Sequence, residues 1–436
     1  MIYSKIVKKI SSNLFDFGHK LFLLGIFFLV SAPFLSLLAF IPSLIIGTKL
    51  NKENVLKDTW NIPFFLASIL MILSCFVHSQ KSHYLGYDYD FKLSIIGLFN
   101  WLPLFWIYWG FQPYLNSKKL RKKCLFFLIC SSVPFILSGL GQYFLGWYGP
   151  YSFLDGFIIW YQRPIDTEVQ GLTSFFNNQN YAGSWLSIIF YISLAFAMKN
   201  EQIKLKKLIS ILISFSVGFS VLLTYSRNAI LSIIFFFLFF IKSKTYLKIL
   251  FIFLCIIIFL LIYSGSLNNI NNIIPIGFYY KLNDLSLQNI LSTPRVTIWS
   301  AVINMISEKP LFGWGAGSFH TLFKSFDLTN INAQHSHNLF LDISFSYGLP
   351  SAILISINLI YLTLKNLIRE FNSATNSNLY NKNIFDIAWK TSTGIFLFSH
   401  LFDITYFDAR ISIFAWILFS GMRNILKENS MAKAIH

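Results

Sequence analysis

Two histidines one residue apart form the pattern in this chain that best suits chemistry. His335 and His337 lie in the sequence His-Ser-His-Asn, directly before an apolar run that begins near Asn338. A neutral imidazole can accept a hydroxyl proton near neutral pH, so the pair is a candidate for acid/base catalysis. A metal site with His320 or Asp342 is less favoured, because no third ligand follows at a clear spacing, and no metal is predicted. In the plainest interpretation, one histidine only caps the helix that begins near Asn338.

Three arginines are candidates for binding an anion. Arg227 lies between two apolar runs, where a guanidinium loses hydration and needs an anion or carbonyl groups, although a single arginine there also reaches lipid headgroups. Arg295 follows a proline at the start of a helix predicted over 294–307, a favourable place for phosphate, although it would also stack on Trp299. Arg163 is either a further phosphate or sugar contact or an ordinary loop arginine.

The elements that would position these residues are membrane helices. The 436-residue chain is 55% hydrophobic and only 12% charged, and its mean hydropathy is +0.59. Such a composition lies outside the range of soluble globular proteins and is typical of a multi-span membrane protein. The net charge of +17 comes from basic residues that flank the apolar runs, so it does not indicate a nucleic-acid partner.

The apolar runs predict an all-α integral membrane protein with about twelve transmembrane helices and both termini in the cytoplasm. The first run, Leu21 to Gly47, is either one tilted helix or a hairpin that turns near Ala32 and Pro33. Only the hairpin places the basic cluster 118–123 on the same side as the basic amino terminus and the later basic loops, as the positive-inside tendency requires. The other runs cover 61–78, 93–114, 124–142, 180–198, 207–224, 228–241, 246–264, 339–364, 384–400 and 409–425.

This topology places the candidate residues on one external face of a single polytopic domain over 1–436. A large external loop, 265–338, lies between helices 9 and 10, and a second external segment covers 143–179. Loops of this length usually bind ligands or catalyse reactions. The glycines of 310–319 predict a tight external turn, since no strand precedes them and no phosphate-binding lysine follows. The last external turn either closes the site with an ion pair or is simply solvated. Its charged residues are Asp403, Asp408 and Arg410.

Four short motifs occur in a fixed order along the second half of the chain. They are Tyr-Ser-Arg-Asn at 225–228, Pro-Arg-x-x-x-Trp at 294–299, Pro-Leu-x-Gly-x-Gly-x-Gly-x-Phe at 310–319 and His-Ser-His-Asn-Leu-Phe-Leu at 335–341. In this order and topology they resemble the O-antigen ligase and O-antigen polymerase superfamily. The resemblance covers about 215–365, including the loop 265–338, and it extends to Phe-Phe-Asn-Asn-Gln-Asn-Tyr-Ala at 175–182.

The resemblance implies a membrane-embedded glycosyltransferase of the GT-C type, which inverts the anomeric centre and needs no metal or other cofactor. Its donor would be a glycan linked to a polyprenyl diphosphate, with the lipid tail between helices in the membrane. Its acceptor would be a hydroxyl of a lipid-core sugar or glycan on the periplasmic face of the bacterial inner membrane. Arg227 and Arg295 would bind the donor diphosphate, and His337 would be the catalytic base. The candidate accessory residues are His335, Asn338 and Arg163.

Three functions stay open on the sequence alone. Ligation of a glycan to a lipid core is favoured over polymerisation of repeat units only by the spacing from His337 to Gly348, which is similar to that of the ligases. A transporter would bind the same lipid-linked glycan without chemistry. It would be expected to carry charged or helix-breaking features near the middle of the membrane in corresponding halves. No such pair of features is evident in the sequence.

Overall fold

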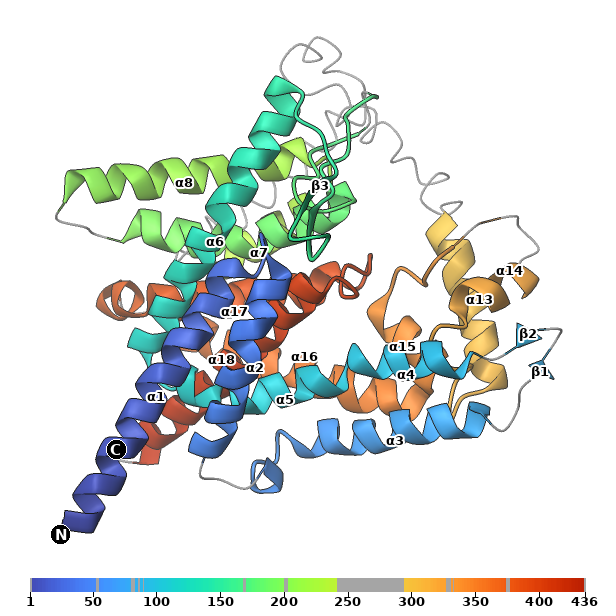
Figure 1. Ribbon diagram of the computed structural model, residues 1–436, viewed down its shortest axis with the longest axis horizontal. Coiled ribbons are helices and arrows are strands. Elements are labelled where there is room, and N and C mark those ends of the chain that lie inside the picture. The colour runs from blue at the N-terminus through green and yellow to red at the C-terminus, as the bar shows by residue number, and fades with distance from the viewer. Residues whose placement is uncertain are drawn as a thin grey trace.

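Helices form most of the structure (Figure 1). This computed structural model describes residues 2–51, 55–79, 83–84, 87–88, 90–167, 170–199, 203–240, 294–326, 331, 333–373 and 377–434. Within these residues, the strands form two antiparallel hairpins. One joins β1 (His83–Tyr84) to β2 (Tyr87–Asp88), and the other joins β3 (Tyr151–Phe153) to β4 (Ile158–Trp160). The predicted helical architecture is therefore confirmed.

Seven described stretches are long and apolar enough to cross a membrane, as expected of a multi-pass membrane protein. They are α2 (Pro33–Leu50), α3 (Ile62–Ser79), α4 with α5 (Phe91–Phe99 and Leu102–Gly110), α6 (Lys118–Leu145), α7 (Gln179–Met198), α8 (Lys204–Leu223) and most of α16 (Leu349–Ser373). The other described helices are α1 (Ile2–Phe28), the short 3-10 turns η1 (Val55–Lys57) and η2 (Gln112–Leu115), α9 (Arg227–Phe240), α13 (Pro294–Glu308), α14 (Phe319–Phe326), α15 (Leu339–Tyr347), α17 (Ser377–Ser399) and α18 (Ala409–Ala434). The total of twelve spans stays a prediction, and the predicted run 246–264 lies outside the described residues.

The first apolar run forms the predicted hairpin. α1 ends at Phe28, α2 begins at Pro33, and the two helices pack side by side (Figure 1, dark blue). Small residues permit the close approach, since a Cβ on Gly25 would lie only 2.4 Å from the ring of Phe40. The hydroxyl group of Ser36 also donates a hydrogen bond to the carbonyl oxygen of Gly25 at 2.7 Å. One apolar run therefore supplies two antiparallel helices.

The predicted run 339–364 is not one helix. It divides at Gly348 into α15 and α16, and α15 is too short to cross a membrane. Gly348 has a φ of +88°, and a Cβ there would lie 2.1 Å from the carbonyl oxygen of Leu311. Only glycine permits this approach of two backbones, so the helix breaks where the segment 310–319 packs against it. That segment is the predicted tight turn, in which the glycines with positive φ are Gly313, Gly315 and Gly317.

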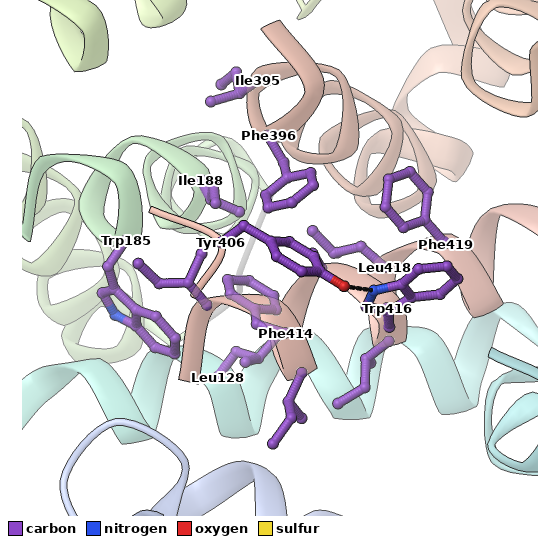
Figure 2. Packing of buried hydrophobic residues seen from close by; sticks show 14 of the residues in the cluster. Leu128, Trp185, Ile188, Ile395, Phe396, Tyr406, Phe414, Trp416, Leu418 and Phe419 are labelled. Atoms are coloured by element: carbon purple, nitrogen blue, oxygen red, sulfur yellow. Dashed lines mark hydrogen bonds between the residues drawn. The ribbon is translucent and has the colours of Figure 1, made fainter. Parts of the chain in front are cut away.

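The main hydrophobic core lies where α6, α7, α17 and α18 meet (Figure 2). Inside it, Trp416 donates its indole N–H to the hydroxyl oxygen of Tyr406 at 3.0 Å, and Tyr406 donates to the carbonyl oxygen of Asn100 at 2.8 Å. Asn100 lies at the break that divides the predicted run 93–114 into α4 and α5. The break precedes Pro103, which has no N–H to continue the helix. The core thus satisfies a carbonyl group that the helix break leaves free.

Buried ion pairs join the helices at the end of the bundle that carries the carboxyl terminus. Arg121 is fully buried and donates hydrogen bonds to Asp386 and Glu428, at 2.8 Å each. Arg423 donates to Asp58 at 2.8 Å. Arg121 belongs to the basic cluster that the charge distribution assigned to the cytoplasm. In the structure, it links α6 to α17 and α18, while the side of the membrane stays a prediction.

Candidate active site

His337 lies in the short segment between α14 and α15 and is held in a left-handed conformation with a φ of +56°. Such a conformation costs a non-glycine residue about 1–2 kcal/mol, so neighbouring contacts must hold it. Ser336 is buried; its carbonyl oxygen accepts a hydrogen bond from Trp299 at 2.9 Å, and its N–H donates to Asp342 at 3.4 Å. Asn338 caps α15 with its side-chain oxygen. The interpretation in which a histidine caps this helix is therefore wrong.

A carboxylate from the turn between α17 and α18 faces His337. Nδ1 of His337 lies 2.9 Å from Oδ1 of Asp403. The side chain of Asp403 is 8% exposed, whereas that of His337 is 29% exposed, so the imidazole is the member of the pair that a ligand can reach. The backbone N–H of Ile404 and the amide of Asn180 also donate to Asp403, at 2.9 Å each. These donors fix the carboxylate in place.

The charges around Asp403 determine which nitrogen of His337 is available. Burial alone would raise the pKa of Asp403, but the hydrogen bond from His337 and the positive charge of Arg295 hold it below its ordinary value. Nη2 of Arg295 lies 3.8 Å from Oδ2 of Asp403. An ionised carboxylate only accepts hydrogen bonds, so Nδ1 of His337 is the donor. Nε2 of a neutral His337 therefore keeps the lone pair that a general base requires.

His335 packs against the same imidazole. The two rings meet edge to face, with centroids 4.2 Å apart. Nδ1 of His335 accepts a hydrogen bond from the backbone N–H of His337 at 3.2 Å. Burial, and then the neighbouring His337 and Arg295, lower the pKa of His335 to about 4, although Asp403 acts in the opposite direction. His335 is thus neutral near pH 7, and its contact supports the left-handed backbone of His337.

Two asparagines tie the candidate segments to the turn between α17 and α18. Asn228, next to Arg227, donates its amide to a carbonyl oxygen at the end of α17 at 2.8 Å. Asn338, next to His337, donates to another carbonyl oxygen of the turn at 3.0 Å. Asp403 lies in the same turn. The turn therefore holds together segments that are far apart in the sequence.

The two other arginines predicted for the site have exposed side chains. Arg227 is the first residue of α9. Arg163 lies in the segment that follows β4, where its backbone N–H donates to the hydroxyl group of Thr173 at 3.2 Å. Among the described residues, no hydrogen bond or ion pair joins the side chain of Arg163 to His335 or His337. The structure brings Arg295 to the histidines and leaves a role for Arg163 as a prediction.

The last turn before α18 contains an ion pair, as one of the two predictions for it stated. Nη2 of Arg410 lies 2.6 Å from Oδ2 of Asp408, and the arginine side chain is only 8% exposed. Arg410 also donates to the carbonyl oxygen of Phe175 and packs on the ring of Phe176. The alternative prediction, that this turn is simply solvated, is therefore wrong. Asp403 takes no part in this pair and faces His337 instead.

The sequence did not predict the pairing of His337 with Asp403, nor the hydrogen bond that Asn180 donates to Asp403. The two members of the pair are 66 residues apart, and no motif connects them. One signal was available, because Asp403 is an acidic residue at a helix end on the same predicted face as the histidines. Asn180 lies in the segment 175–182 that contributed to the family resemblance.

The same groups are close enough together to hold a metal ion. The potential ligand atoms of three residues lie within 4.8 Å of one another: His335, His337 and Asp403. Two imidazoles and a carboxylate suit zinc or a related ion. The third group is Asp403, whereas the less favoured metal site considered from the sequence would have used His320 or Asp342. The guanidinium of Arg295, 3.8 Å from Asp403, repels a further cation, so the arrangement favours acid/base chemistry.

Residues 208–356 match the model of a family described as O-Antigen ligase, over about a third of the chain. The chain carries an O-antigen ligase family domain. The match supports membership of the O-antigen ligase and polymerase superfamily, so the predicted resemblance is confirmed. All four motifs lie inside the domain, together with Arg227, Arg295 and His337. Asp403 and Asn180 lie outside it, so elements on both sides of the ligase-family domain complete the site. The boundaries 215–365 stay a prediction. No curated protein matches the chain.

Proposed function

We propose that this protein transfers a glycan from a polyprenyl-diphosphate-linked donor to a hydroxyl acceptor on the periplasmic face of the bacterial inner membrane. One observation carries the proposal: His337 pairs with an ionised Asp403 beside the guanidinium of Arg295, at an O-antigen ligase family domain. A base and a fixed cation are what a reaction needs when a hydroxyl attacks a sugar carbon and a diphosphate leaves. The family supports glycan chemistry, and the geometry supports the roles of the residues.

In the proposed reaction, Nε2 of His337 takes the proton of the acceptor hydroxyl as its oxygen attacks the anomeric carbon. The new carbon–oxygen bond forms opposite the bond to the diphosphate, which breaks with its electron pair on the leaving oxygen. The anomeric configuration is therefore inverted. Asp403 stabilises the imidazolium that forms, and the proton then passes from His337 to solvent. Arginine charges take the place that a metal ion has in other transferases.

Arg227 and Arg295 are proposed to hold the donor diphosphate. Arg227 is the first residue of α9, and Arg295 is the second residue of α13. Both therefore lie in the first turn of a helix, where backbone N–H groups also favour phosphate. Arg295 is 38% exposed and only 3.8 Å from Asp403, so a ligand can reach its guanidinium while the carboxylate still orients it. A guanidinium binds phosphate oxygens with two parallel hydrogen bonds, which stabilises the leaving diphosphate.

The substitution Arg295→Lys tests this contact, because an ammonium group does not reproduce the two parallel bonds. We expect the affinity for a purified polyprenyl-diphosphate-linked glycan, measured in detergent, to fall by about 10- to 100-fold, since a hydrogen bond to a charged group contributes about 1.5–3 kcal/mol. Arg369→Lys is the matched control, because Arg369 donates to the carbonyl oxygen of Asn429 at 3.0 Å and has no proposed role at the site, so the affinity should stay unchanged. Equal donor affinity in the two variants would rule out diphosphate binding by Arg295.

A ligase-like reaction is proposed ahead of polymerisation, on the spacing between His337 and Gly348. Asn338 and Gly348 cap the two ends of α15, so this spacing corresponds to the length of one helix. Glycan profiling of a deletion strain separates the two reactions. A ligase predicts loss of all surface polymer attached to the lipid core, whereas a polymerase predicts that a single repeat unit survives on the core.

A further inference from the structure

The hairpin of β3 and β4 exposes apolar side chains at its turn. Leu154 is 56% exposed and Phe157 is 60% exposed, and they flank the two residues at the tip of the turn. The tip residues, Asp155 and Gly156, are ordinary turn residues, but the exposed leucine and phenylalanine beside them are not. From residue 144 to residue 162, Asp155 is the sole charged residue. This surface is therefore unlike that of a loop that faces water.

At its base, the hairpin continues from a candidate membrane span. α6 ends at Leu145, and the side chains of Phe144 and Leu145 are 60% and 67% exposed. Trp147 and Tyr148 follow directly and are also exposed. Tryptophan and tyrosine are enriched at both membrane–water interfaces, because their rings combine an apolar body with a polar group. The apolar surface thus passes from the end of the span into the hairpin without a charged residue.

The hairpin also contacts the turn between α1 and α2, through Phe157 beside its tip and Trp160 at its base. The ring of Phe157 stacks on Phe34, with centroids 4.5 Å apart. Phe34 is the second residue of the candidate span α2. The indole of Trp160 donates to the carbonyl oxygen of Ser31 at 2.6 Å. Figure 1 shows β3 beside α6 and close to the α1–α2 turn. The hairpin therefore lies against the ends of two candidate spans, α6 and α2.

We infer that the β3–β4 hairpin is a membrane-interface anchor. Its turn and exposed aromatic rings lie among the headgroups and upper acyl chains of the lipid leaflet at that end of the helices. Lipid is the partner that fits, because the surface is apolar, nearly uncharged and continuous with helices that face lipid. The inference does not depend on the proposed glycan transfer. It assigns a partner to the hairpin, which among the described residues makes no hydrogen bond or ring contact with His335, His337 or Asp403.

A fluorescent probe at the turn tests the anchor in the full-length protein. Leu154→Cys would be made in a variant whose four native cysteines are replaced by alanine, labelled with a nitrobenzoxadiazole (NBD) probe, and reconstituted in phosphatidylcholine and phosphatidylglycerol nanodiscs. Thr167→Cys, labelled in the same way, is the matched control, because Thr167 is exposed in a polar stretch of the same external segment. Each sample would be quenched with lipids that carry a nitroxide near the headgroup, and separately with aqueous iodide.

The anchor predicts that nitroxide lipids quench the probe at residue 154 at least several-fold more strongly than the probe at residue 167, and that iodide shows the opposite order. Strong iodide quenching at residue 154 without lipid quenching would overturn the inference. If a soluble core oligosaccharide then protected that probe from iodide, the surface would be a carbohydrate-binding platform instead. The quenching measurements do not involve glycan transfer, so their results do not depend on whether His337 is the base.

Discussion

Asp403 determines which nitrogen of His337 can meet a substrate. Its ionised carboxylate accepts the proton of Nδ1, which leaves Nε2 as the basic atom. Asn180 and the backbone of Ile404 fix the carboxylate, so the imidazole has one orientation. A histidine in a loop would otherwise be free to rotate. The catalytic hypothesis for His337 therefore rests on a residue 66 positions away.

The substitution Asp403→Asn tests this dependence. The asparagine amide can turn its N–H groups toward His337, which places the imidazole proton on Nε2 and removes the base. We expect the rate of glycan transfer to fall by about 10²–10⁴-fold, the usual contribution of general-base catalysis. Donor affinity should persist, because Arg227 and Arg295 are retained. Asp166→Asn, at an exposed carboxylate in the segment that follows β4, is the control. A transfer rate in Asp403→Asn equal to that of the control would refute the orienting role.

Chelation tests the choice between a base and a metal site at the same residues. Because Arg295 already supplies a positive charge beside Asp403, we expect glycan transfer to be unchanged after incubation with EDTA and gel filtration. Restoration of a lost activity by added zinc would show instead that His335, His337 and Asp403 bind a metal.

The site residues show which parts of the site could be predicted from the sequence alone. His337 and Arg295 were predicted because their motifs stand out within an apolar chain, and the structure places them together around Asp403. Asp403 itself was not predicted as their partner, since pairing across α17 requires knowledge of the fold. Arg163 was predicted by residue type alone, and residue type does not determine which direction a loop arginine faces.

Among the secondary-structure elements, Gly348 separates two helices that hydropathy alone merges. Its φ of +88° and the carbonyl oxygen of Leu311 exclude a side chain. Gly146 also has a positive φ, of +66°, but no atom lies within 4 Å of its would-be Cβ. We expect Gly146→Ala to reduce the free energy of unfolding by about 1–2 kcal/mol, the cost of a left-handed alanine. Gly348→Ala should lower the melting temperature much further, measured by size-exclusion chromatography after heating. An equal fall in melting temperature in the two variants would contradict the close backbone contact at Gly348.

The helices show which features of the sequence carry structural information. Charge placement was sufficient to predict that the first run is a hairpin, because only a hairpin keeps the basic amino terminus and the basic cluster 118–123 on the same side of the membrane. The break at Gly348 was not predicted, because a hydropathy average does not reveal that another backbone packs at that position. The helix 294–307 was predicted within one residue of the observed α13, since a proline marks its start.

At the scale of the whole molecule, a buried charged cluster joins the three helices α6, α17 and α18. Arg121 is buried between Asp386 and Glu428. Arg121→Met would leave Asp386 buried without its partner, which typically costs about 3–5 kcal/mol. We expect the variant to lose the monodisperse peak at a clearly lower temperature than the wild type. Arg163→Met is the control at an exposed arginine. If both variants melt together, the cluster contributes little to stability.

The proposed reaction requires His337 to act as the base in glycan transfer. Single-turnover transfer by the purified protein in nanodiscs measures this role most directly, with donor binding measured on the same samples. We expect His337→Ala to lower the transfer rate by about 10²–10⁴-fold, while the affinity for the polyprenyl-diphosphate-linked donor stays at the wild-type value. Transfer at the wild-type rate by His337→Ala would show that His337 is not the base.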